Sequence, residues 1–202
     1  MEEVIEVTEV TEVSDVRIAA EIIRRGGVVI YPTETVYGIG ADALSQSAVR
    51  RVFAIKKRTL AMSLAVSGYE MIEDVAICDM ATIQKLLPGP VTVILKKKPV
   101  VPDILTAGSD KVGIRYPDHE MTLRLIDLAG TPITSTSANR SGEPPAREVR
   151  EISRALLHDV DYTVDGGRCR YGTASTVIDL VDMRILRKGA GYQACLDVLT
   201  GC

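Results

Sequence analysis

The chain has 202 residues, of which 46% are hydrophobic and 25% charged, the usual balance for a soluble globular protein with one sizeable core. No apolar run approaches the roughly 20 residues needed to cross a bilayer, and the acidic N-terminus does not read as a secretory signal, so we expect a cytoplasmic protein without a membrane partner. The four cysteines are dispersed and there are only two histidines, which favours neither a zinc site nor a disulfide framework.

The net charge of −3 is unevenly distributed. The first fifteen residues hold five Glu, one Asp and no Lys or Arg, so the remainder of the chain carries +3. No acidic residue lies between Asp42 and Glu70, where the basic residues Arg50, Arg51, Lys56, Lys57 and Arg58 fall. A local excess of cations of this kind favours an anionic ligand.

In chain order, residues 2–13 repeat a Glu-Val-x triplet that predicts a charged edge strand or, alternatively, a frayed tail. Ser14 is expected to cap a helix over Asp15–Arg25, and the glycine pair that follows ends it. A β-branched strand over Val28–Ile30 comes next and stops at Pro32.

Further elements alternate along the rest of the chain. Helices are expected from Ser45 or Ser47 to about Ile55, then over Asp79–Leu87, Glu120–Ala129, Arg147–Leu157 and Tyr192–Leu199. Strands are expected over Leu64–Val66, Val91–Leu95, Val112–Tyr116, Ile133–Ser135, Tyr162–Asp165, Ser175–Leu180 and Arg184–Arg187. This alternation predicts a single α/β domain around a twisted mixed sheet.

The stretch Gly26–Ala43 has the composition of a ligand-binding loop. After the strand, the hydroxyl, carboxyl and phenol groups of Thr33, Glu34, Thr35 and Tyr37 crowd against two glycines. Residues 38–43 also match the dinucleotide fingerprint G-x-G-x-x-A, but the polar insert after the strand and the lack of an acid about 20 residues on argue against that fold.

Other candidate residues stand out by position. Arg115 is a lone cation in an apolar strand and needs an anionic partner, either internal or a ligand. Ser135, Ser137 and Asn139 alternate at a strand end, so their side chains are expected on one side. Lys56 and Arg58 are spaced to grip two oxygens of a polyphosphate, although a solvated helix end would look the same.

Six motifs in order make the chain resemble the YrdC-like family, the threonylcarbamoyl-AMP synthases. They are YPTETVYGIGADA at Tyr31–Ala43, the Lys56/Arg58 pair, PGPVTVIL at Pro88–Leu95, VGIRYPDH at Val112–His119, STSANRSGEPP at Ser135–Pro145, and STVID followed by ILRKGA up to Ala190. The resemblance implies a YrdC-like fold with a concave, positively charged cavity. It also implies an enzyme that joins L-threonine, bicarbonate and ATP, and thereby supports threonylcarbamoyladenosine formation on tRNA.

The resemblance also implies residue roles. L-threonine would be held by Thr35, Ser67, Arg115, Ser135 and Ser175, and ATP by Lys56, Arg58, Met62, Ser137, Asn139 and Arg187, with Lys56 and Arg58 as the catalytic cations. Mg²⁺ would accompany ATP, without an assigned protein ligand. A transferase complex acting downstream would be a further partner, and weak binding of tRNA or double-stranded RNA is a possible addition.

The chain departs from the family pattern at five positions. Thr59 and Ser63 replace prolines, Met62 a polar residue and Ser67 a histidine, while Lys111 stands where a small hydroxyl residue is common. Two alternatives therefore remain open: an RNA-binding module without turnover, which a basic concave surface would also suit, and an inert scaffold subunit.

Overall fold

The computed structural model describes residues 14–57, 60–140 and 142–201. The predicted strand or tail over residues 2–13 lies outside them. Residues 14–24 are helical, which confirms the predicted helix except that it ends one residue early; the predicted cap at Ser14 stays a prediction. The helix is tied to the sheet through Asp15, whose carboxylate accepts a hydrogen bond from the Tyr162 hydroxyl at 2.7 Å.

Within the described residues, ten strands form one twisted mixed sheet, and the mixed sheet was predicted. They are β1 (Val29–Tyr31), β2 (Gly38–Gly40), β3 (Ser63–Ala65), β4 (Ala76–Ile77), β5 (Val91–Lys97), β6 (Lys111–Arg115), β7 (Ile133–Ser137), β8 (Tyr162–Thr163), β9 (Thr176–Asp179) and β10 (Arg184–Arg187). Their order is β10-β9-β5-β6-β3-β7-β2-β1-β8, with β4 beside β5. The pairs β1–β8, β3–β6 and β5–β9 are parallel and the remaining pairs antiparallel.

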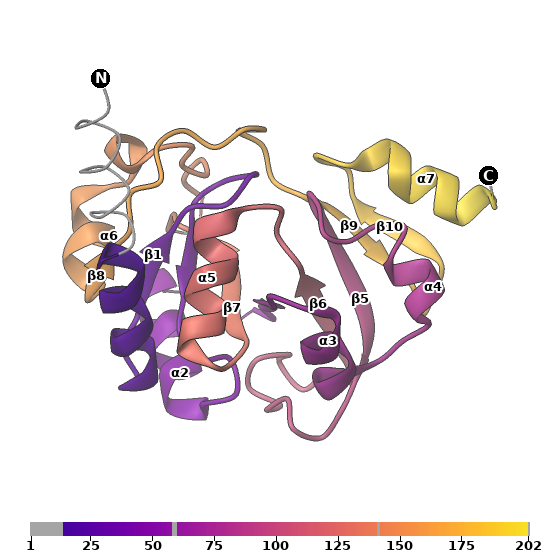
Figure 1. The fold of residues 1–202 in the computed structure, drawn as a ribbon, viewed down its shortest axis with the longest axis horizontal. Coiled ribbons are helices and arrows are strands. Elements are labelled where there is room, and N and C mark those ends of the chain that lie inside the picture. The colour runs from indigo at the N-terminus through magenta and orange to yellow at the C-terminus, as the bar shows by residue number, and fades with distance from the viewer. Residues whose placement is uncertain (1–13, 58–59, 141, 202) are drawn as a thin grey trace.

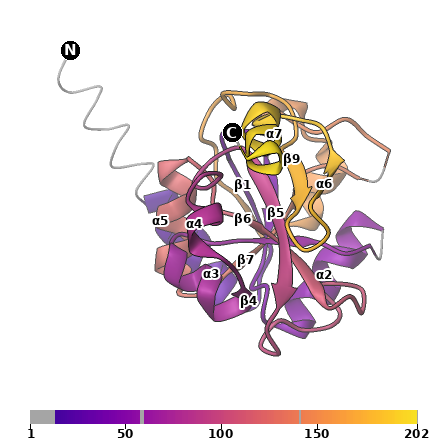
Figure 2. The same ribbon diagram turned by 90° about the vertical axis from the view of Figure 1, so that its right-hand side faces the viewer.

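Helices cover both faces of this sheet. They are α2 (Gln46–Lys56), α3 (Tyr69–Val75), α4 (Met80–Ile83), α5 (Glu120–Ala129), α6 (Arg154–Asp159) and α7 (Tyr192–Thr200). The helix of residues 14–24 and α6 lie toward one end of the molecule and α7 toward the other (Figure 1). Seen from the α7 end, α3, α4 and α5 lie on one side of β5 and α2 on the other (Figure 2).

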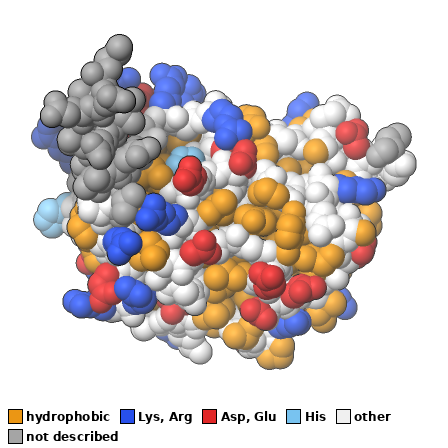
Figure 3. All heavy atoms as spheres, in the orientation of Figure 1, with side chains coloured by type: hydrophobic (Ala, Val, Ile, Leu, Met, Phe, Trp, Pro, Cys, Tyr) orange, Lys and Arg blue, Asp and Glu red, His pale blue; other side chains and the backbone are white. Residues whose placement is uncertain are grey.

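The core is divided between the two faces of the sheet. Val28 and Ile30 pack into the larger cluster, whereas the alternate residues Val29 and Tyr31 pack against the helix of residues 14–24 and α5. A strand buried on both faces reads as a continuous apolar run, which is the pattern that identified this strand in the sequence. On the face shown in Figure 3, apolar side chains also gather at the surface around α3.

Three predicted elements differ from the structure. Helix α4 ends at Ile83 rather than Leu87, because residues 84–86 continue as turns. The helix predicted over 147–157 is split into a 3₁₀ turn, η1 (Val149–Glu151), and α6, since Ile152 has extended backbone with φ −78° and ψ 132°. The predicted strand over 162–165 is only two residues long.

The stretch after Pro32 is also more regular than a ligand loop. Residues 38–40 form β2, which pairs with β1 and β7, and sequence reasoning missed this strand as well as α3 and β4. The glycines of β2 have a packing cause. A Cβ atom at Gly38 would lie 2.8 Å from Cζ of Tyr31, and one at Gly40 would lie 3.0 Å from its Cδ1. Both glycines therefore make room for the Tyr31 ring.

Candidate active site

The structure contains a cavity of about 350 Å³, which is within the size range of small-molecule sites. Its walls come from the segment after β1, from the strands β2, β3, β5, β6, β7 and β9, and from the end of β10. The lining residues are Tyr31, Thr33, Thr35, Val36, Tyr37, Gly38, Ala61, Met62, Ser63, Thr92, Arg115, Ser135, Thr136, Ser137, Pro145, Ala174, Ser175, Val177 and Arg187.

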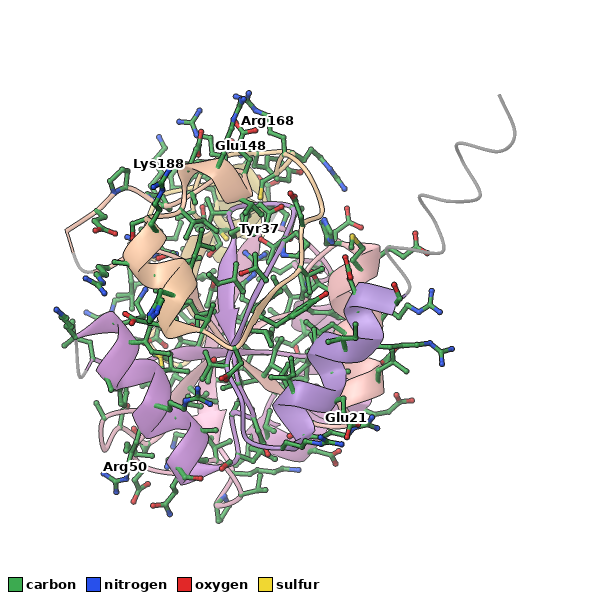
Figure 4. All side chains as sticks on the ribbon, turned by 90° about the vertical axis from the view of Figure 1, so that its left-hand side faces the viewer. Glu21, Tyr37, Arg50, Glu148, Arg168 and Lys188 are labelled. Carbon is green, nitrogen blue, oxygen red and sulfur yellow. The ribbon has the colours of Figure 1, made fainter. Side chains whose placement is uncertain are left out.

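The first wall is the segment Thr33–Tyr37, held by local hydrogen bonds. The Thr33 hydroxyl donates to the Val36 carbonyl at 2.7 Å, receives the Thr35 and Val36 amides, and lies 2.9 Å from the Thr35 hydroxyl. Tyr37 fastens the end of the wall, because its hydroxyl lies 2.7 Å from the Gly167 carbonyl oxygen and receives the Gly166 amide at 3.1 Å. In Figure 4 Tyr37 lies inside the molecule, whereas Arg50 on α2 and Glu21 project from the opposite end to Arg168 and Lys188.

Arg115, at the end of β6, has an internal anionic partner. Its Nη2 donates to Oε1 of Glu34 at 2.6 Å, and the two side chains are 5% and 0% exposed. The sequence left open whether the anionic partner of Arg115 is internal or a ligand, and the structure shows an internal one. Arg115 nevertheless lines the cavity, and this one hydrogen bond uses only one of its five N–H donors.

On the opposite wall, three polar side chains form a chain of hydrogen bonds. The Ser175 hydroxyl lies 2.7 Å from the Thr92 hydroxyl and accepts from Nη2 of Arg187 at 3.1 Å. Nε of Arg187 also donates to the Ser175 carbonyl at 3.1 Å. These contacts link β5, the start of β9 and the end of β10, and they hold the guanidinium of Arg187 at the cavity.

The charged groups of the cavity lining are cations. Of its lining residues, the two charged ones are Arg115 and Arg187. Burial and the neighbouring Arg115 both lower the pKa of Arg187, as expected for two cations that share one hollow. Burial also raises the pKa of the Tyr31 phenol to about 12, so this lining group stays neutral. The positive charge predicted for the cavity stays a prediction, because Arg115 is paired with Glu34.

The structure gathers most of the predicted site residues in this cavity. Its lining includes seven of them: Thr35, Met62, Arg115, Ser135, Ser137, Ser175 and Arg187. Arg58, together with Thr59, lies outside the described residues. Sequence reasoning placed Tyr31 and Thr33 in a ligand-binding loop without giving either a role, and it did not assign Ser63 or Thr92 to a site. A hydroxyl in the apolar run VTVIL was the available signal for Thr92, but threonine is equally common in strands.

Lys56, Asn139 and Ser67 do not line the cavity. Nζ of Lys56 donates to the carbonyl oxygens of Ser137 and Asn139, so this buried lysine fastens the turn after β7. The Asn139 side chain receives the Ser137 hydroxyl and donates to the Glu143 carbonyl within the same turn. The Ser67 hydroxyl contacts Sδ of Met71 at 3.5 Å. Their predicted ligand contacts stay predictions.

The potential metal ligands do not form a metal site within the part of the chain that the structure describes. No group of three or more His, Cys, Asp or Glu there could hold a metal ion. Glu34, which lies between the lining residues Thr33 and Thr35, is committed to Arg115. A resident metal ion therefore does not fit the described residues.

Comparison with known proteins places the chain in a family. Residues 21–189 match the Sua5/yciO/yrdC family model, described as "Telomere recombination". The chain belongs to the Sua5/YciO/YrdC family. This family member is 40% identical over 188 residues to the threonylcarbamoyl-AMP synthase of Pyrococcus abyssi, covering 90% of this chain and 55% of that protein. A relative from Methanocaldococcus jannaschii is 43% identical over 169 residues, or 81% of this chain and 79% of that protein.

A solved structure agrees with these matches. The crystal structure of P. abyssi Sua5 complexed with L-threonine superposes with a TM-score of 0.86 at 38% identity, covering 92% of this family member and 57% of that chain. The predicted YrdC-like fold is thereby confirmed. The chain spans little more than half the length of the P. abyssi protein. Within the described residues, no helix of this family member is both long and apolar enough to span a membrane.

Proposed function

We propose that this chain is an L-threonylcarbamoyladenylate synthase, a nucleotidyltransferase that joins L-threonine, bicarbonate and ATP and releases pyrophosphate. The observation that carries the proposal is that two arginines, Arg115 and Arg187, line one cavity together with several hydroxyl side chains. The likeness to P. abyssi Sua5, which was crystallised with L-threonine, supports an amino-acid subsite here.

The amino acid would occupy the part of the cavity near Arg115. A guanidinium is suited to a carboxylate because its donors form a planar fork. The hydroxyls of Thr35, Ser135 and Ser175 line the same hollow and would accept from or donate to the amino and hydroxyl groups of L-threonine. Ser67 would reach this subsite only after its contact with Met71 is broken.

The nucleotide would lie toward Arg187, Met62 and Ser137. Lys56 would act on this subsite by holding the turn that carries Ser137 and Asn139, and the predicted pair with Arg58 would add charge close to the phosphates. Mg²⁺ would enter as part of the ATP substrate. Bicarbonate and the amine of L-threonine would give a carbamate and water.

The chemistry then needs no protein nucleophile. A carbamate oxygen attacks the α-phosphorus of ATP, the bond from that phosphorus to the bridging oxygen of the β-phosphate breaks, and pyrophosphate leaves. The protein contributes by positioning the two reactants and by offsetting phosphate charge with fixed cations. The product would supply a transferase complex that modifies tRNA, and we expect the chain to act in the cytoplasm.

A pyrophosphate-release assay tests the proposal. Release should require L-threonine, bicarbonate and ATP together, and omission of any one should reduce it to background. Release that is indifferent to L-threonine or bicarbonate would contradict the proposal. Salt-sensitive affinity for tRNA or double-stranded RNA without turnover, unchanged in Arg115→Ala, would instead favour an RNA-binding module.

A further inference from the structure

Glu34 is a buried acid at the cavity for which the proposed chemistry has no direct use. It is 1% exposed, and its backbone carbonyl accepts the Tyr171 amide at 2.8 Å. Its neighbours Thr33 and Thr35 line the cavity, whereas Glu34 is absent from the described lining residues. The Glu34 carboxylate therefore meets Arg115 from behind the cavity wall.

The contact between the two side chains is one-sided. Oε1 of Glu34 accepts from Nη2 of Arg115 at 2.6 Å, but the buried Oε2 atom has no hydrogen-bond partner among the described residues. A carboxylate built only for stability would be expected to satisfy both oxygens, because a buried and half-satisfied ion pair is costly. The arrangement is better explained by what it does to Arg115.

We propose that Glu34 is a positioning residue that holds Arg115 by one nitrogen and makes the adjoining subsite selective for a carboxylate over a phosphate. This inference rests on the proposed function, and it specifies how the L-threonine subsite excludes the phosphates of ATP. Holding Nη2 from behind would restrict the guanidinium and leave its remaining donors available to a ligand in the cavity that Arg115 lines.

The selectivity follows from charge. Glu34 and Arg115 together carry no net charge, so a ligand there gains hydrogen bonds but little net attraction. A singly charged carboxylate tolerates this well. A doubly charged phosphate loses more, because its desolvation costs far more than that of a singly charged carboxylate, and the neutral pair offers no net attraction to offset that cost. Arg187, which has no ion-pair partner among the described residues, keeps its full charge for phosphate. Two arginines in one hollow would thus recognise different anions.

The test follows the Arg115 side-chain Nε–H resonance by NMR during titration with sodium acetate or inorganic phosphate near pH 7.5. The signal is assigned by its loss in Arg115→Gln. In the wild-type chain, acetate should shift it at lower concentration than phosphate. In Glu34→Gln, which keeps the shape but removes the charge, the ratio of phosphate to acetate dissociation constants should fall at least tenfold. An unchanged ratio would overturn the proposal.

Two further measurements guard against a merely structural effect. Glu34→Asp restores the negative charge and should retain the wild-type preference, whereas a loss equal to that of Glu34→Gln would also contradict the proposal. If Glu34→Gln does not fold, tighter binding of phosphate than of acetate at Arg115 of the wild-type chain would still overturn it. An L-threonine titration read at the same resonance addresses the proposed function separately. Absence of a shift with L-threonine, beside the expected acetate preference, would reject the substrate and keep the role of Glu34.

Discussion

Strand β6 carries a cation near each end, and the two are used in opposite ways. Lys111 at the start is bound by two carboxylates, with Nζ 3.0 Å from Oδ2 of Asp179 and 2.7 Å from Oδ1 of Asp182. Arg115 at the end has a single carboxylate, Glu34, and faces a cavity. The first cation is neutralised by two carboxylates of the protein, whereas the second has one and keeps donors for a ligand. A buried charge with spare hydrogen-bonding capacity is therefore the better indicator of function.

The largest effect should come from breaking the Arg115 pair. Arg115→Gln leaves the Glu34 carboxylate buried without a cation, which is expected to lower the free energy of unfolding by about 3–5 kcal/mol. Urea denaturation measures this, and L-threonine affinity in the surviving folded protein should be lost. The double variant Glu34→Gln/Arg115→Gln removes both charges and should recover much of the stability but none of the affinity. A loss below about 1 kcal/mol in the single variant would contradict the importance of the pair.

The second effect concerns the other cavity arginine. Arg187→Gln should weaken ATP binding roughly 10- to 100-fold, because charge-assisted hydrogen bonds contribute about 1.5–3 kcal/mol each. L-threonine affinity should change less, since Arg187 would act on the amino acid only indirectly, through its hydrogen bonds to Ser175. Isothermal titration calorimetry with each ligand separates the two. Arg184→Gln is the matched control on the same strand, where the side chain is exposed and pairs with Asp182 at 3.2 Å. Equal losses of ATP affinity in both variants would show that the loss depends on the removed charge and not on the position of the arginine.

The contrast between the ends of β6 could be predicted from sequence only in part. Arg115 stood out as a cation inside an apolar strand, and Val112–Tyr116 was correctly placed as that strand apart from its ends. Its partner could not be found, because Glu34 lies 81 residues away and nothing local couples the two. Pairing of this kind depends on β1 and β6 lying on the same sheet, which the order of elements along the chain does not specify.

Local signals explain which other predictions held. Ser45 caps α2 through the Ala48 amide, as one of the two predicted start sites required. Helix α3, only seven residues long, was missed because its pattern YEMIEDV is too short to establish a period. Lys56 was predicted to bind phosphate from its spacing with Arg58 and from the family resemblance, and that role stays a prediction. Its contact with the two carbonyls after β7 depends on tertiary packing that no neighbouring residue reveals.

A smaller effect is expected at the Lys111 end of β6. Lys111→Gln should lower the free energy of unfolding by less than Arg115→Gln, because the Lys111 side chain is 22% exposed and water can replace part of its contacts. Affinity for L-threonine should be unchanged, since Lys111 is absent from the described lining residues. Lys96→Gln is the matched control, as Lys96 is exposed and lies opposite Lys111 in the register of β5 and β6. A loss of L-threonine affinity in Lys111→Gln would remove the contrast between the two ends.

The smallest effect is a pH dependence at Asp179. Burial raises the pKa of its carboxyl, but hydrogen bonds from the Asp182 amide, Lys111 and the Val181 amide outweigh it, so the folded-state pKa lies below the usual 3.8. A lowered pKa means that the ionised form stabilises the fold above the unfolded value, about 3.9, and that this contribution is lost as the pH falls through the folded pKa. Asp179→Asn should therefore be destabilising at pH 7, and its deficit against the wild type should shrink below about pH 4. Urea denaturation at pH 7, 5 and 3 measures it. A deficit that is constant over this range would mean that Asp179 acts through shape and amide hydrogen bonds, and that the charge of Lys111 is dispensable.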